Sequence, residues 1–298
     1  MNNIESQLPP DPPEFDRELL SNCEKTGNWT PVLFEWYKYT GQSAIYTASI
    51  DPESPALRKI DPKYFTILIG LINRCARLML SNVVLTHEGK FGETASIIDR
   101  CISESAIKIR WLCKKNSKDC FMRFMADGLK SEIEFKKKIQ ENIKSHNGLE
   151  MVIEERMLKS IDRYIQTSGL SPEEIVRSKK LPDLANMLND LEIDRLGYVV
   201  IQRMGSHHIH GTWPGLLCHY LEETDKGLSL RDHDCAPSDN QYVLIPLLVI
   251  NALSDFVAFI FEDTEDINAF TYWLEGIKEE ILKINSLISS EDIEYTKH

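Results

Sequence analysis

The pattern of hydrophobic and polar positions along the chain is helical. Apolar residues recur at intervals of three and four over long stretches, whereas runs that alternate between apolar and polar residues are almost absent. The spacing predicts long helices over 62–87, 93–115, 117–146, 149–169, 242–263 and 265–288. We therefore expect an all-α fold in which the helices form one multi-helix bundle.

Local signals place several helix ends and loops. Gly92 permits a turn between the first two helices, and the motif "SPEEI" at 171–175 combines a capping serine with a proline at the first helical position. A further helix that contains residues 194–210 is expected to end at Gly211, because glycine readily adopts the left-handed conformation that closes helices. The polar stretch 222–241 is expected to be a loop.

The predicted elements indicate a single helical-bundle domain over residues 61–290. Residues 1–60 are rich in proline and irregular in pattern, so they predict an N-terminal extension that forms an arm around the bundle. The helices within 117–169 carry long charged faces, and we expect them to project as a helical hairpin.

Charge and cysteine content narrow the class of protein. The net charge of −12 excludes a surface that attracts nucleic acid as a whole, so a nucleic-acid substrate requires a local basic site, for example one assembled between subunits. The seven cysteines include no CxxC pair, which favours the reduced thiols of a cytoplasmic protein over a disulfide framework. The N-terminus lacks the basic start and apolar run of a signal peptide.

The most apolar stretch, 242–261, approaches the length that spans a membrane. It contains Pro246, Asn251, Ser254 and Asp255, and acidic residues follow it directly. We therefore interpret it as a buried core helix, and we expect no membrane association.

The stretch "RMGSHHIH" concentrates titratable side chains on one predicted helix. With about 100° per residue, Arg203, His207 and His210 share a face, Ser206 lies at its edge, and His208 points away. These three side chains are therefore the candidate functional residues of the helix.

The same face is apolar upstream, where it carries Leu196, Val199 and Val200. The polar groups that follow therefore face the interior or a cleft. Because a buried charge is costly unless it is paired, Arg203 needs an acidic partner or an anionic ligand.

A candidate partner lies in the helix predicted over 93–115. Arg100 and Glu104 are four residues apart and can pair along the helix, between the apolar Ile97 and Ile107. The two polar stripes are expected to meet in one buried network. Such a network serves either a ligand or only the stability of the bundle.

Two motifs in these helices resemble a bacterial family of uncharacterised all-helical proteins. The stretch "IIDRCISESAIKIRWL" resembles the R-x-x-x-E helix of that family, and "MGSHHIHGTWPG" resembles its second signature, S-x-x-x-H-G-[ST]. The second signature corresponds to Ser206, His210, Gly211 and Thr212. The resemblance covers about residues 60–265.

The second motif also resembles the HEPN superfamily, in which an arginine precedes a histidine by four to six intervening residues. Four residues separate Arg203 from His208 and six separate it from His210, and the helical geometry favours His210. The resemblance implies a helical bundle that commonly dimerises, and it implies a metal-independent ribonuclease of toxin–antitoxin or anti-phage systems. The chain departs from the pattern at Met204, where HEPN nucleases carry a polar residue.

Cleavage of RNA without a metal needs a base for the 2′-hydroxyl, an acid for the leaving oxygen and positive charge on the phosphate. His210, at a helix C-terminus that favours the imidazolium, and His207 are the expected proton-transfer groups, and Arg203 is expected to bind the phosphate. Glu104 orients a histidine or pairs with Arg203, while Arg100 and Ser206 support the site. No cofactor is required, and RNA and a second copy of the chain are the expected partners.

Two other classes of function stay open at this point. The His207–His210 cluster, His219 and the Asp232–Cys235 cluster offer ligands for a transition metal, although their spacing matches no established site. The long charged helices instead suit a non-catalytic sensor or scaffold, or a module that binds nucleotide phosphates. The neighbours Cys218 and His219 cannot face each other on a helix, so the sequence does not predict a cysteine nucleophile.

Overall fold

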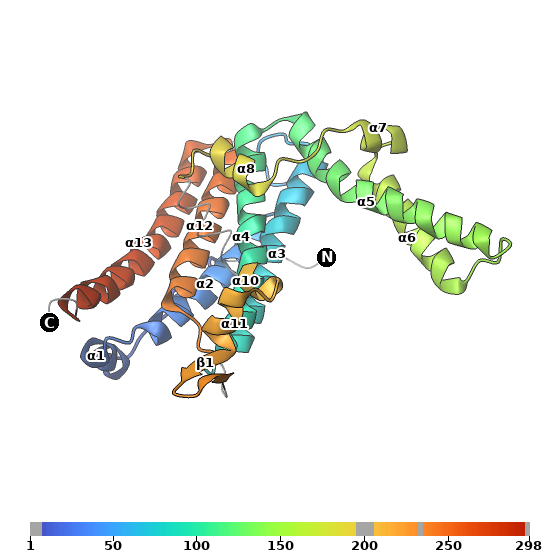
Figure 1. Cartoon of the computed structure of the whole chain (residues 1–298). Helices are drawn as coiled ribbons and strands as arrows, with labels where there is room; N and C mark the ends of the chain where they lie inside the picture. Colours follow the sequence, from blue (N-terminus) through green and yellow to red (C-terminus); the bar gives the residue numbers. More distant parts are fainter. Residues whose placement is uncertain (1–7, 195–205, 232–234, 296–298) are drawn as a thin grey trace. The chain divides into compact units, whose positions relative to one another are not determined.

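The structure is a computed structural model that describes residues 8–194, 206–231 and 235–295 (Figure 1). Its contacts divide the chain into two compact units. One unit comprises Met1–Lys114 and Leu184–His298, and the other comprises Lys115–Asp183. Both units are mostly helical, which confirms the all-α fold class for the described residues.

The first unit contains α13 (Thr264–Tyr295), which with 32 residues is the longest described helix, and four of the unit's helices pack side by side around its core (Figure 1). Its helices are α1 (Arg17–Thr26), α2 (Thr30–Ala48), α3 (Pro62–Thr86), α4 (Gly92–Lys115), α8 (Leu184–Asp190), α10 (Ser206–Ile209), α11 (Trp213–His219), α12 (Asp239–Ile260) and α13 (Thr264–Tyr295). Helix α2 packs on α3 and α12, and α13 packs on α12. The helices predicted over 62–87 and 93–115 are confirmed as α3 and α4.

Helix α12 is the core helix that the apolar stretch 242–261 predicts. It is apolar on nearly every side, and most of its residues, including Ile245, Ile250 and Phe256, are buried against neighbouring helices. By length and composition alone, α3 and α12 would each suffice to cross a membrane. In α12, 67% of the most apolar window is buried inside the fold, as in the core of a globular unit.

The prediction of an irregular N-terminal extension is wrong over α1 and α2. Helix α2 is central to the bundle, and its Leu33 and Ala44 are fully buried. Its helical period is obscured in the sequence because hydroxyl-bearing residues occupy buried positions. Thr40 and Ser43 nevertheless tolerate burial, since each hydroxyl donates to the carbonyl four residues earlier, at 2.8 and 2.9 Å.

The second unit is a helical hairpin closed by a short helix. It consists of α5 (Lys118–Ser145), α6 (Val152–Ser168) and α7 (Pro172–Arg177). A small apolar core joins all three helices, and its members are Ala126, Leu129, Ile133, Ile165, Leu170 and Ile175. The predicted capping motif is present, because the Ser171 side chain accepts from the backbone N–H of Glu174 while Glu174 bonds back to Ser171.

The prediction that 222–241 is a loop is wrong over its first part. Strands β1 (Leu221–Thr224) and β2 (Gly227–Leu230) form an antiparallel hairpin in which Thr224 pairs with Gly227. Most residues of both strands are exposed, so the sequence lacks the apolar alternation by which a half-buried strand is recognised. The positive φ of 109° at Gly227 explains why a glycine follows the two-residue turn.

The central position of α2 leads to a first prediction. Replacing the fully buried Leu33 by alanine should lower the free energy of unfolding by about 2–5 kcal/mol, because the substitution leaves a cavity in a packed core. Urea denaturation of the full chain measures this loss. The matched control is Leu8→Ala, which removes the same atoms from a side chain that is 83% exposed. Equal effects of the two substitutions would contradict the packing of α2 in the core.

Candidate functional site

The structure describes only part of the predicted arginine–histidine face. Arg203 lies outside the described residues, as does the side chain of His207. Helix α10 begins at Ser206, and the backbone N–H of His210 donates to the Ser206 carbonyl at 3.2 Å. Gly211 follows with a φ of 55°, in the left-handed region expected of a residue that closes a helix. The imidazole of His210 is exposed, so solvent and substrates can reach it.

Arg100 and Glu104 pair along α4 as their spacing predicts. Nε of Arg100 lies 3.3 Å from Oε1 of Glu104, and both side chains are partly exposed. Nη1 of the same guanidinium is buried and has no hydrogen-bond acceptor among the residues that the structure describes. Within the described residues, Nη1 of Arg100 therefore remains without an acceptor. A contact between this pair and Arg203 stays a prediction.

A buried polar network surrounds Asp99, the residue directly before Arg100. Asp99 is 1% exposed, and three helices donate hydrogen bonds to its carboxyl group. Oδ1 accepts from the hydroxyl of Tyr37 on α2 at 3.1 Å and from Nδ2 of Asn82 on α3 at 2.7 Å. Oδ2 accepts from Nε2 of Gln241 on α12 at 2.9 Å. Four helices, including α4 itself, thus meet at one carboxyl group.

Burial dominates the electrostatics of this network. Removal from water raises the pKa of Asp99 from 3.8 to about 7, although the hydrogen bonds from Gln241, Tyr37 and Asn82 oppose the shift by stabilising the carboxylate. Burial and the nearby Asp99 charge also raise the pKa of the Tyr37 hydroxyl well above its usual value. The carboxyl of Asp99 therefore titrates near neutral pH within the core.

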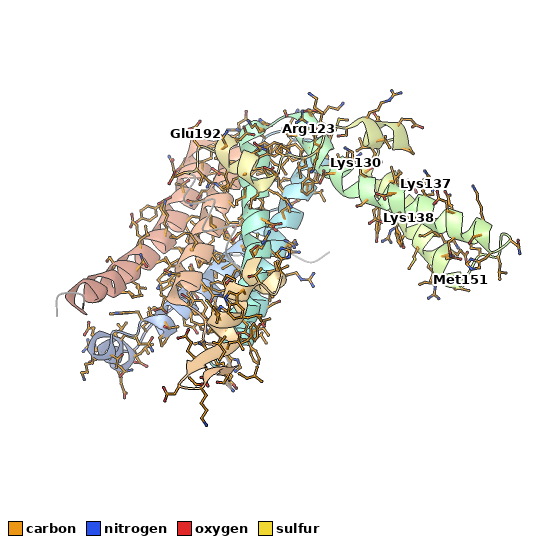
Figure 2. The ribbon with its side chains drawn as sticks, in the orientation of Figure 1. Arg123, Lys130, Lys137, Lys138, Met151 and Glu192 are labelled. Atoms are coloured by element: carbon orange, nitrogen blue, oxygen red, sulfur yellow. The ribbon has the colours of Figure 1, made fainter. Side chains whose placement is uncertain are left out.

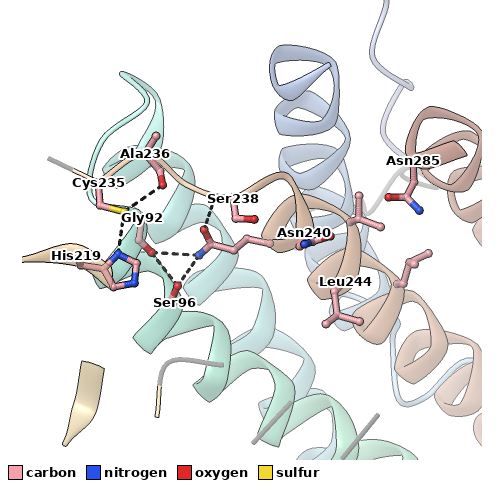
Figure 3. Close-up of a pocket in the computed structure, with 12 residues that line it drawn as sticks. Gly92, Ser96, His219, Cys235, Ala236, Ser238, Asn240, Leu244 and Asn285 are labelled. Carbon is pink, nitrogen blue, oxygen red and sulfur yellow. Dashed lines mark hydrogen bonds between the residues drawn. The ribbon is translucent and has the colours of Figure 1, made fainter. Parts of the chain in front are cut away.

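A pocket of about 540 Å³ opens beside this network (Figure 3). Its wall includes the start of α4, the start of α12 and the strap, which we define as residues 235–238. Gly92 holds the strap in place, because its N–H donates to the Cys235 carbonyl at 2.8 Å and its own carbonyl accepts from Nε2 of Gln241 at 3.2 Å. A Cβ at Gly92 would lie 2.5 Å from the Ala236 carbonyl oxygen, so only glycine fits there.

At one end of the pocket, a histidine and a cysteine face each other. Nδ1 of His219, on the last residue of α11, lies 2.9 Å from Sγ of Cys235 on the strap (Figure 3). The sequence missed this pair because the two residues are 16 positions apart and the hairpin β1–β2 returns the chain between them. Two of the predicted metal ligands are thus adjacent. Among the described residues, however, no group of three histidine, cysteine or acidic side chains is arranged to hold a metal ion.

The sequence did contain a signal for Asp99. Ala95, Asp99, Ile102 and Ala106 recur at helical spacing, and all four are buried in the structure. An acidic residue within such an apolar stripe indicates a buried carboxyl group that other helices must satisfy.

The raised pKa of Asp99 gives a prediction about stability. The folded state holds this proton more tightly than the unfolded chain, whose aspartate pKa is about 3.9. The contribution of Asp99 is therefore fully present below about pH 4 and is lost as the pH rises through 7, by up to about 4 kcal/mol. Urea denaturation across this range should show that Asp99→Asn removes the loss. The exposed Asp225→Asn should preserve it, and an unchanged pH dependence in Asp99→Asn would contradict the assignment.

Comparison with known proteins places these features in a family. The pattern of DUF5677, a family of unknown function, matches residues 65–228, which is more than half of the chain. No curated protein and no solved structure matches the chain. The matched region contains the Arg100–Glu104 pair, Asp99 and the turn at His210, whereas Cys235 lies beyond it. The chain therefore belongs to the DUF5677 family.

Proposed function

We propose that this protein is a HEPN-like, metal-independent endoribonuclease in which His210 transfers a proton and Arg203 binds the phosphate. The observation that carries the proposal is the exposed imidazole of His210 on the turn that closes α10. A proton-transfer group must reach its substrate, and a histidine titrates in the pH range that acid–base catalysis requires. The roles of Arg203 and His207 rest on the sequence.

In the proposed reaction, one histidine removes the proton of the ribose 2′-hydroxyl, and the 2′-oxygen attacks the adjacent phosphorus. A second histidine donates a proton to the leaving 5′-oxygen, so that a cyclic phosphate and a free 5′-hydroxyl result. His210 and His207 are the candidates within one chain, and a homodimer would supply further histidines. Arg203 stabilises the charge on the phosphate oxygens through its planar guanidinium.

The charge distribution between the two units supports an anionic substrate. Lys115–Asp183 contains 14 lysines and arginines against 12 acidic residues, a net charge of +2, whereas the whole chain carries −12. Several of these cations lie along α5, and Figure 2 labels four of them: Arg123, Lys130, Lys137 and Lys138. The second unit is therefore close to neutral, whereas the rest of the chain is strongly acidic, so it is the unit that repels RNA less. We place the reaction in the cytoplasm and assign it no cofactor.

Removing the imidazole of His210 tests the catalytic role. His210→Ala should lower the rate of cleavage of a mixed-sequence RNA by at least about 100-fold, because a general acid or base contributes about 10²- to 10⁴-fold. The assay contains EDTA, and gel electrophoresis of the products measures the rate. His87→Ala, which removes another exposed histidine of the first unit, should cleave at the wild-type rate.

Full activity in His210→Ala, or no cleavage by the wild type in any condition, would contradict the ribonuclease assignment. RNA binding without cleavage by the wild type would instead favour a module that binds nucleic acid or nucleotide phosphates. Loss of toxicity in cells that overexpress His210→Ala provides an independent readout of the same activity.

The exposed lysines of the second unit lead to a prediction about RNA binding. Lys137 and Lys138 are 77% and 67% exposed, so the double change Lys137→Glu/Lys138→Glu alters the surface charge without disturbing the core. The affinity for single-stranded RNA should fall, and the slope of log affinity against log salt should fall by at least about 1. Fluorescence anisotropy across a potassium chloride series measures both quantities.

The control Lys59→Glu/Lys283→Glu makes the same change in net charge with exposed residues of the first unit. It should leave the salt slope near the wild-type value, because these lysines lie outside the second unit. Equal losses in the two double variants would show that only net charge matters and would contradict a basic binding region in the second unit.

A further inference from the structure

The pocket beside Asp99 has a chemistry that the proposed ribonuclease does not use. Its polar end carries the thiol of Cys235 and the imidazole of His219, and its wall includes the apolar side chains of Val243, Leu244 and Leu247 on α12 (Figure 3). The volume of about 540 Å³ is typical of pockets that hold small molecules. The pocket therefore combines a thiol–imidazole pair with an apolar wall.

The contact between the two side chains is short. The 2.9 Å between Sγ of Cys235 and Nδ1 of His219 is within hydrogen-bond distance, so the imidazole nitrogen is in position to accept the thiol proton. The Ala236 carbonyl oxygen, 3.5 Å from the same sulfur, is a more distant acceptor. His219 is thus the nearer proton acceptor for the thiol.

We propose that Cys235 is a nucleophilic thiol, that His219 is its general base, and that the pocket binds the apolar acyl group of an activated ester or thioester. Sγ attacks the carbonyl carbon of the acyl donor and forms a new S–C bond, while the thiol proton passes to Nδ1 of His219. The bond between the carbonyl carbon and the leaving group then breaks, and His219 returns the proton to the leaving group. The products are an acyl thioester on Cys235 and the free alcohol or thiol.

The surroundings of Cys235 make a base necessary. Burial and the nearby carboxylate of Glu93 raise the pKa of the thiol, while Arg231 acts in the opposite direction. Cys235 is therefore a protonated thiol near neutral pH and does not react as a free thiolate. Its reactivity depends on proton transfer to His219 at the moment of attack.

The backbone keeps the thiol at a fixed position. The hydrogen bond from Gly92 N–H to the Cys235 carbonyl fastens the strap to the first turn of α4, and Gln241 links that turn to the start of α12. Ser238 N–H donates in turn to Oε1 of Gln241 at 2.7 Å. The strap is thus tied to two long helices, which holds a nucleophile in the orientation that reaction requires.

The neighbouring Cys218 provides an internal control. Cys218 is exposed, whereas Cys235 is only partly exposed, so accessibility alone predicts that Cys218 reacts faster with any electrophile. The proposal predicts the opposite order for an acyl donor. Incubation of the full chain with p-nitrophenyl butyrate, followed by peptide mass spectrometry, gives the rate of acylation at each cysteine.

In the wild type, Cys235 should acquire the butyryl group faster than Cys218, with release of one p-nitrophenolate for each acyl group transferred. His219→Gln should slow acylation of Cys235 by at least about 100-fold and leave the rate at Cys218 unchanged. An unchanged circular dichroism spectrum shows that the variant is folded, and the unchanged Cys218 rate shows that the acyl donor reacts equally well in both samples. Faster acylation of Cys218 in the wild type, or an equal Cys235 rate in His219→Gln, would overturn the proposal.

Chain length and a control histidine define the site further. p-Nitrophenyl butyrate should acylate Cys235 faster than p-nitrophenyl acetate, because the longer chain buries more apolar surface against α12. Equal rates at Cys235, after correction for the intrinsic reactivity measured at Cys218, would contradict acyl binding in the pocket. His87→Ala should acylate at the wild-type rate, since this exposed histidine belongs neither to the pocket nor to the proposed ribonuclease site.

Discussion

The buried carboxyl group of Asp99 is the constraint on which the first unit depends. A carboxyl group cannot remain in an apolar core unless donors surround it, and α2, α3 and α12 each supply one. These hydrogen bonds require Tyr37, Asn82 and Gln241 to converge on one point of α4. Hydrophobic burial alone would allow the helices to slide or rotate at little cost. We expect the network instead to favour one register of the four helices, a role that buried polar groups fulfil in several proteins.

The same network determines what lies at the surface. Nε2 of Gln241 donates to Asp99, and Oε1 of Gln241 accepts from the backbone N–H of Ser238 in the strap. One side chain thus links the buried carboxyl group to the strap that carries Cys235. On α4, Arg100 directly follows Asp99 and pairs with Glu104 on a partly exposed face. A change in the core at Asp99 is therefore linked to the pocket through the side chain of Gln241. Because Asp99 titrates near neutral pH, its protonation state changes the charge beside the pocket, to which Gln241 links it.

Much of the fold follows from local sequence signals, and much of the site does not. Long apolar periods predict α3 and α12 to within a few residues, and the capping motif at Ser171 predicts the start of α7. Helix α2 is missed because its buried hydroxyl groups are satisfied by its own backbone, a compensation that apolar periodicity does not register. The pair of Arg100 and Glu104 is predictable, since its members are neighbours on one helix. The pair of His219 and Cys235 is not predictable in this way, because it depends on how a short exposed hairpin directs the chain back toward α11.

Convergence on Asp99 is the central claim, and titration of its carboxyl carbon by nuclear magnetic resonance tests it most directly. The account predicts a midpoint at about pH 7, because removal from water raises the pKa of Asp99 more than its three hydrogen-bond donors lower it. A midpoint near 3.8 would show that removal from water does not dominate the electrostatics of this carboxyl group, and it would contradict the account of Asp99 as a carboxyl group buried among four helices.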